Sequence, residues 1–201
     1  MLMALTAGAV MLSACSRPDP AAGVRDDSGG VALSDTAADN RVSLYDLTSV
    51  WRNQRGDTLH LAALRGRVRI VAMVYTSCHA TCPRIVGDLK RIASSVPAPQ
   101  RDQVGLVLVS LDPDRDTPGM LAAWATSSRL DSARWTLLAG SPGDTRALAA
   151  ALDVRYAPAP DGEIAHTNGF AVLDRLGVVA YQQTGLGEID AAVRAVHALL
   201  R

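Results

Sequence analysis

Two long apolar runs, each followed by a helical pattern, dominate the hydropathy of this chain. Residues 68–75 and 104–110 are mostly apolar and rich in β-branched side chains, which is typical of strands buried on both faces. Between them, Arg84 to Ile92 shows the spacing of an amphipathic helix. Strand, helix and strand in this order predict a parallel crossover unit at the centre of an α/β domain.

Weaker patterns surround this unit. Upstream, residues 42–47 alternate as a strand does, and Gly56-Asp57 precedes another alternating stretch, which predicts an N-terminal β-hairpin. Downstream, the patterns predict a helix from Pro118 to about Ala125 with Thr117 as N-cap, a strand at 135–139, a helix at 144–152 capped by Asp144, an antiparallel hairpin of 167–173 with 178–182, and an amphipathic helix at 188–200. Residues 156–165 carry prolines and Asp161-Gly162, which predicts a loop leading to His166.

The N-terminal part has a different character. Residues 1–11 are apolar but too few to span a bilayer, and Leu12-Ser13-Ala14-Cys15 follows them. This tetrapeptide resembles the lipobox of bacterial lipoproteins, which implies a signal peptide over residues 1–14 and a lipid anchor on Cys15. Residues 15–41 have no apolar period and predict a flexible tether, so residues 42–201 form the expected domain.

Composition narrows the classes of partner. Twenty Lys and Arg balance twenty Asp and Glu, and this zero net charge gives no electrostatic reason to expect nucleic acid or an acidic membrane surface as partner. We therefore expect no nucleic acid, and contact with the membrane through the lipid anchor only. At 201 residues, 48% of them hydrophobic, the chain suits one core and one domain.

The candidate chemistry lies where the first buried strand gives way to a helix. Cys78 and Cys82 are four residues apart at this junction, where unpaired N–H groups and the helix dipole favour a thiolate. The spacing allows a disulfide or a shared metal ion, and it closes too short a loop for a structural staple. With one imidazole added, two thiolates suit copper or zinc, and His166 is the best candidate for that third ligand.

Plainer interpretations exist for each residue. The cysteines could be an inert buried pair or a simple disulfide, and His166 a hydrogen-bonded loop histidine. His79 is expected to be exposed, with an auxiliary ligand role as the alternative, while His60 faces solvent and His197 lies near a helix C-terminus. The carboxylates of Asp112, Asp114 and Asp116 fit turn and capping roles.

Three motifs in order resemble the Sco/SenC family of copper-delivery proteins. They are Tyr-Thr-Ser-Cys-His-Ala-Thr-Cys-Pro at 75–83, Ser-Leu-Asp-Pro-Asp-Arg-Asp-Thr-Pro at 110–118, and His166 ahead of Phe-Ala-Val-Leu-Asp-Arg-Leu-Gly at 170–177. The resemblance implies a thioredoxin-like fold with a central mixed β-sheet flanked by helices, copper held by Cys78, Cys82 and His166, and a supporting role for Asp112. It also implies assembly of the dinuclear copper centre in subunit II of cytochrome c oxidase.

The sequence therefore predicts a copper chaperone that is lipid-anchored in the bacterial cell envelope and faces the periplasm. An exposed site with three protein ligands would pass Cu(I) or Cu(II) to oxidase subunit II, or to another copper client, by ligand exchange. A thiol reductant would keep the pair reduced. The alternative is a thiol–disulfide oxidoreductase that uses the Cys78/Cys82 pair without metal. A third and simpler hypothesis is a lipoprotein scaffold in which the two cysteines only form a disulfide.

Overall fold

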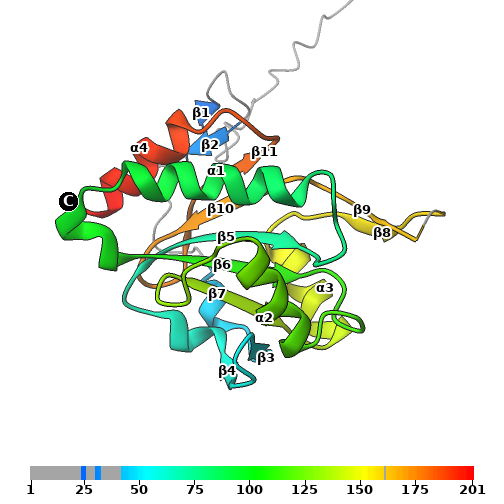
Figure 1. Ribbon diagram of the computed structural model, residues 1–201. Helices are drawn as coiled ribbons and strands as arrows, with labels where there is room; N and C mark the ends of the chain where they lie inside the picture. The colour runs from blue at the N-terminus through cyan, green and yellow to red at the C-terminus, as the bar shows by residue number, and fades with distance from the viewer. Residues whose placement is uncertain (1–23, 26–29, 33–41, 161) are drawn as a thin grey trace, which may run out of the picture.

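A mixed β-sheet forms the middle layer of the domain (Figure 1). The computed structural model describes residues 24–25, 30–32, 42–160 and 162–201. Within these residues the strands are β1 (Val24–Arg25), β2 (Gly30–Ala32), β3 (Val50–Asn53), β4 (Thr58–His60), β5 (Val68–Val74), β6 (Val104–Ser110), β7 (Trp135–Ala139), β8 (Tyr156–Pro158), β9 (Ile164–His166), β10 (Gly169–Leu173) and β11 (Val179–Thr184).

Helices connect and cover these strands. The α-helices are α1 (Cys82–Ser95), α2 (Pro118–Ser127), α3 (Pro142–Ala151) and α4 (Asp190–Leu199), and the short 3₁₀ helices are η2 (Leu44–Asp46), η3 (Leu61–Leu64) and η4 (Ala98–Gln103). The order of strands in the main sheet is β1-β2-β11-β10-β5-β6-β7-β3-β4, while β8 and β9 form a separate two-stranded sheet.

The parallel core of the sheet is the predicted crossover unit. Strands β5 and β6 pair in parallel from Val68↔Val104 to Val74↔Ser110, and β7 continues the parallel set on the other side of β6. The remaining pairings are antiparallel, including β10 with β5 and with β11. The predicted α/β class with a central mixed sheet is therefore confirmed.

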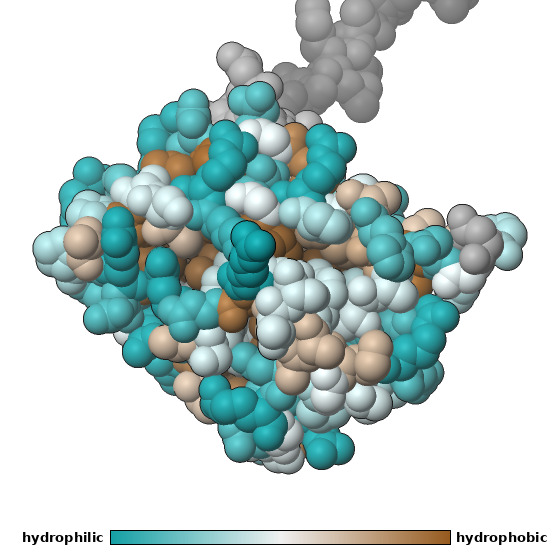
Figure 2. All heavy atoms as spheres, viewed as in Figure 1, coloured by the Kyte–Doolittle hydropathy of each residue, from teal (hydrophilic) through white to brown (hydrophobic). Residues whose placement is uncertain are grey.

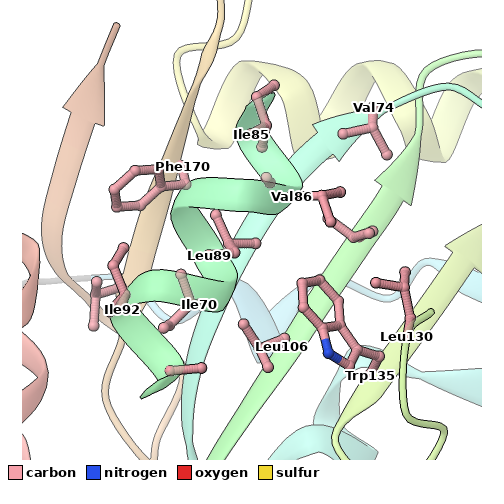
Figure 3. Packing of buried hydrophobic residues seen from close by; sticks show 14 of the residues in the cluster. Ile70, Val74, Ile85, Val86, Leu89, Ile92, Leu106, Leu130, Trp135 and Phe170 are labelled. Carbon is pink, nitrogen blue, oxygen red and sulfur yellow. The ribbon is translucent and has the colours of Figure 1, made fainter. Parts of the chain in front are cut away.

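Alternate residues of β5 and β6 belong to two different hydrophobic clusters, one on each face of the sheet. Ile70 and Leu106 pack with Ile85 and Leu89 of α1, and α2 and α4 contribute to the same cluster (Figure 3). Val71 and its neighbours face η2, η3 and α3 on the opposite side. Over α1, hydrophilic side chains cover the surface and hydrophobic ones show only between them (Figure 2). Both faces of the central strands are thus buried, as their uniformly apolar sequence predicts.

The N-terminal hairpin exists, but its first strand was predicted in the wrong place. Residues 42–47 contain the 3₁₀ helix η2, and β3 at Val50–Asn53 is the strand that pairs with β4. The Ser43 hydroxyl accepts a hydrogen bond from the Tyr45 N–H, and Leu44 and Tyr45 are both buried against the sheet. A short helix therefore buries two consecutive apolar side chains that an alternating strand would place on opposite faces.

Other boundaries show one success and two errors. Thr117 caps α2 and accepts from the Met120 N–H, as predicted. Helix α3 begins at Pro142 with Ser141 as its cap, so Asp144 is not the N-cap but a first-turn residue that bonds to the Ser141 hydroxyl. The predicted loop at 156–165 instead contains the β8–β9 hairpin, which pairs Tyr156 with His166.

The N-terminal predictions are only partly covered. Residues 1–14 and Cys15 lie outside the described residues, so the signal peptide and lipid anchor stay predictions. Within the predicted tether, β1 and β2 are short strands, and β2 pairs with β11 at the edge of the main sheet. In the part of the chain that the structure describes, no helix has both the length and the apolarity needed to cross a membrane.

Replacing Gly177 with alanine is expected to destabilise the domain by about 2 kcal/mol. Gly177 has φ +88°, and an added Cβ would lie 2.4 Å from the buried ring of Tyr45. Gly56 is the matched control, because its φ is +86° but no atom lies within 4 Å of the added Cβ. Gly56→Ala should lower the free energy of unfolding by about 1 kcal/mol, which is the strain of an alanine in the left-handed backbone conformation. Urea unfolding measures both, and equal losses would show that the Tyr45 contact contributes nothing.

Candidate metal centre

The turn after β5 brings the two cysteine sulfurs together. The Cys78 N–H donates to the Tyr75 carbonyl at 3.2 Å, and α1 begins at Cys82 with Pro83 next to it. The Cys78 sulfur accepts from the Cys82 N–H at 3.3 Å and lies 3.6 Å from the Thr81 hydroxyl. Thr81, the N-cap residue, makes no capping bond with its own side chain, so the Cys78 sulfur satisfies one of the free N–H groups of the first turn.

The two thiols differ in acidity although they are neighbours. Burial raises the pKa of Cys78, but hydrogen bonds from Cys82 and Thr81 outweigh it and lower that pKa to about 7. Burial raises the pKa of Cys82, and its hydrogen bond to Cys78 and the charge of Asp116 raise it further. At neutral pH the Cys82 thiol therefore keeps its proton, whereas the Cys78 thiol is partly ionised. Cys78 is thus the reactive thiol of the reduced pair and Cys82 the protected one.

Titration of the reduced, metal-free protein is expected to show a thiolate forming with a midpoint near pH 7. The lowered pKa of Cys78, about 7, means that its thiol loses its proton as pH rises through that value. An ordinary cysteine would titrate at about 8.5. Ultraviolet absorbance of the thiolate follows the step, and the Cys78→Ser variant should lack it. If the absorbance change near pH 7 persists in the Cys78→Ser variant, another group is responsible for it.

His166, at the end of β9, completes the cluster. Its Nδ1 lies 3.1 Å from the Thr167 carbonyl, so Nδ1 carries the proton and Nε2 presents its lone pair. Burial lowers the pKa of His166, although the bond to Thr167 opposes that effect, and the ring is favoured in its neutral form. Nε2 is buried and has no hydrogen-bond partner among the described residues.

The donor set fits a soft metal ion. One ligand atom each from Cys78, Cys82 and His166 lie within 4.8 Å of one another. A buried ring nitrogen without a partner costs free energy unless something binds it, and a metal ion between it and the sulfurs would do so. Two thiolates and one imidazole suit copper, in particular cuprous ion. The site is not exposed as expected from the sequence, because Cys78 is 5% exposed and Cys82 is fully buried.

Sequence reasoning missed the contacts of Tyr75. Its hydroxyl donates to Glu163 Oε2 at 2.5 Å and accepts from the Ile164 N–H at 3.2 Å. Its ring meets the His166 ring edge-on, with centroids 5.8 Å apart. Burial raises the pKa of Tyr75, and the bond to Glu163 raises it further, so the phenol stays a donor at neutral pH. No spacing in the sequence signals these contacts, because they join residues about ninety positions apart.

The carboxylates of Asp112 and Asp116 in the Asp-rich motif make different contacts near the cluster. Asp112 forms an ion pair with Arg115, whose guanidinium also reaches the Gly162 carbonyl at the tip of the β8–β9 hairpin. The carboxylate nearest the cysteine turn belongs to Asp116, which is buried and accepts from the Thr76 N–H, the Thr76 hydroxyl and the Ser110 hydroxyl. Asp112 thus reaches the hairpin through Arg115, and Asp116 holds the turn that leads to Cys78.

The other histidines lie apart from this cluster. His79, between the cysteines, is exposed. His60 is also exposed, with Nδ1 beside the Ser49 carbonyl, and His197 lies in the last turn of α4 with Nε2 beside the Ser95 carbonyl. These placements agree with the sequence-based expectations for all three.

Comparison with known proteins decides the family. A family model described as SCO1/SenC matches residues 38–201. The chain belongs to the SCO1/SenC family. A curated relative, a putative copper-binding protein of Stutzerimonas stutzeri, is 29% identical over 125 residues, which cover 60% of this chain and 60% of that protein. The match therefore spans less than two thirds of that relative.

Solved structures of SCO1/SenC proteins share the fold. A SCO1/SenC family lipoprotein of Bacillus anthracis has a TM-score of 0.69 at 23% identity, covering 79% of this chain and 96% of that one. ScoI of Arabidopsis thaliana, solved with copper bound, has a TM-score of 0.66 at 18% identity, covering 75% and 96%. The predicted thioredoxin-like fold is therefore confirmed.

Proposed function

We propose that this protein is a lipid-tethered copper chaperone of the bacterial cell envelope that faces the periplasm. Cys78, Cys82 and His166 would hold one copper ion, and the client would be the dinuclear copper site of cytochrome c oxidase subunit II. The observation that carries the proposal is the buried His166 Nε2, which lacks a partner among the described residues and lies with both cysteine sulfurs. Membership of a family with copper-bound structures supports it.

Transfer would proceed by exchange of ligands. Three protein ligands leave a cuprous ion able to accept a thiolate from the client before it releases the two cysteine thiolates. Because the sulfurs are buried, the client reaches the metal only if a covering segment moves. We expect the β8–β9 hairpin to be that segment, since its last residue, His166, lies with the two sulfurs and its tip extends away from the domain (Figure 1).

The test combines metal stoichiometry with delivery. Protein purified with reduced thiols is expected to bind one cuprous ion and to lose it to the metal-free soluble domain of oxidase subunit II. Size-exclusion separation followed by metal analysis reads both steps. Absence of stoichiometric copper would reject the chaperone, whereas copper binding without transfer would reject only this client.

The unequal cysteines favour a second candidate, a thiol–disulfide oxidoreductase. The Cys78 thiolate would attack a client disulfide, and Cys82 would then lose its proton and displace the client thiolate, which leaves a Cys78–Cys82 disulfide and a dithiol client. A thiol reductant would regenerate the pair. Reduction of a disulfide substrate by the metal-free His166→Ala variant, at the rate of the unsubstituted protein, supports this candidate, because the step needs no imidazole.

A further inference from the structure

Tyr75 touches both halves of the candidate metal centre. Its backbone carbonyl accepts from the Cys78 N–H, while its side chain makes two hydrogen bonds and one ring contact with residues 163–166. The residue itself follows β5 and is buried. A single residue directly after the central strand β5 therefore links the cysteine turn to the hairpin that carries His166.

Apolar packing and polar contacts both attach the hairpin: Ile164 packs against both hydrophobic clusters and Tyr156 against one of them. Strands β8 and β9 have three residues each and form a sheet separate from the main one. A two-stranded ribbon of this length is marginal by itself. At its tip, Arg115 reaches the Gly162 carbonyl over 3.4 Å, and this contact is exposed. The Tyr75 hydrogen bonds are shorter and partly buried, so they hold the hairpin near His166 more strongly than the Arg115 contact does at its tip.

We propose that Tyr75, through Glu163 and the Ile164 N–H, latches the His166 hairpin over the cysteine pair and so sets the rate of copper release. This inference rests on the proposed chaperone function. Because the sulfurs are buried, the imidazole must leave before a client thiolate can approach, and the hairpin must lift for that to happen. Tyr75 acts through His166 and is a positioning residue, not a ligand.

The central experiment is Tyr75→Phe, which keeps the ring against His166 and removes both hydrogen bonds. Loss of two hydrogen bonds from the closed state should raise the first-order rate of Cu(I) release to a chromophoric chelator roughly 10- to 100-fold. Tyr156→Phe is the matched control, because it also removes one phenol hydroxyl, in this case from β8 of the same hairpin. The rate of Cu(I) release from this variant should equal that of the unsubstituted protein.

Two further variants separate positioning from general loosening. Glu163→Gln keeps a side-chain oxygen that can accept from Tyr75, so it should retain slow release, whereas Glu163→Ala should accelerate it. Combining Glu163→Ala with Tyr75→Phe should add little, because both remove the same bond. The nitrogen hyperfine signal of the Cu(II) form should persist in Tyr75→Phe, since His166 still binds but leaves sooner.

Several results would overturn the latch. They are unchanged release in Tyr75→Phe, equal acceleration in Tyr156→Phe, or fully additive effects in the double variant. Should the unsubstituted protein bind no copper, the chaperone proposal fails by itself. The latch is then decided in the metal-free protein by amide hydrogen exchange at Ile164. Exchange should speed up roughly tenfold in Tyr75→Phe, and equal protection in the two proteins would refute the latch.

Discussion

Replacing Cys82 with serine is expected to weaken Cu(I) binding by roughly two to three orders of magnitude. Structural zinc sites with four ligands bind metal with about 10–16 kcal/mol, so each ligand contributes about 2.5–4 kcal/mol, which corresponds to roughly 100- to 1000-fold in affinity. A serine hydroxyl is a hard, protonated donor that does not replace a thiolate on cuprous ion. Cys78→Ser should have a similar effect, because both sulfurs lie within reach of one ion.

His166→Ala should lower the affinity less, by roughly 10- to 100-fold, since imidazole is a weaker donor to cuprous ion than thiolate. His60→Ala is the matched control, because that ring lies against the Ser49 carbonyl, away from the cysteines. Competition titration against a Cu(I) chelator without oxygen measures all four variants. Equal affinities for His166→Ala and His60→Ala would exclude His166 as a ligand, and an unaltered affinity in Cys82→Ser would exclude the site.

The central part of the fold was predictable because its signals are local and strong. Seven consecutive residues of β5 and seven of β6 are buried, so uniform apolarity identifies both strands. Thr117-Pro118 begins α2 as expected, since a hydroxyl cap and a first-turn proline act within one turn. The position of the cysteine pair at the strand–helix junction follows from the apolar run of β5 and from Pro83 in the first turn of α1.

Errors occurred where tertiary contacts decide the local structure. Residues 42–47 alternate like a strand, yet Leu44 and Tyr45 bury together in a 3₁₀ turn because Ser43 caps it and Gly177 leaves room for the Tyr45 ring. The β8–β9 hairpin has only three residues per strand and contains prolines at 158 and 160, so its pairing has no visible period. Propensity favours a loop there, and contacts with Tyr75 and Arg115 from distant segments hold the ribbon.

The candidate ligands were predictable as residue types, but the groups that position them were not. Cys78 and Cys82 stand out by spacing, and His166 by the three motifs taken in order. The Asp-rich motif offered three carboxylates with equivalent local signals. Only the path of the loop after β6 directs Asp116 inward, where it is 1% exposed, and Asp112 toward Arg115. Choosing among adjacent polar residues therefore requires the three-dimensional course of the chain.

Replacing Asp116 with alanine is expected to lower the free energy of unfolding by about 3 kcal/mol, because buried donors lose a charged acceptor. The Thr76 N–H donates to Oδ2 at 3.1 Å, and the hydroxyls of Thr76 and Ser110 donate at 2.5 and 2.6 Å. The hydroxyls can turn toward other acceptors, but the backbone N–H cannot. Asp116→Asn should lose less, about 1–2 kcal/mol, since one oxygen remains as an acceptor.

Asp114→Ala is the matched control for both variants, because Asp114 belongs to the same loop but is exposed; its unfolding free energy should change by less than about 0.5 kcal/mol. Urea unfolding of the metal-free proteins gives the three values. Thr76 lies two residues before Cys78, so a loosened Thr76 should also raise hydrogen exchange at the Cys78 amide. Equal stability of Asp116→Ala and Asp114→Ala would mean that the cysteine turn is held by its own backbone bonds alone, and that the buried carboxylate beside it contributes nothing to the shape of the metal centre.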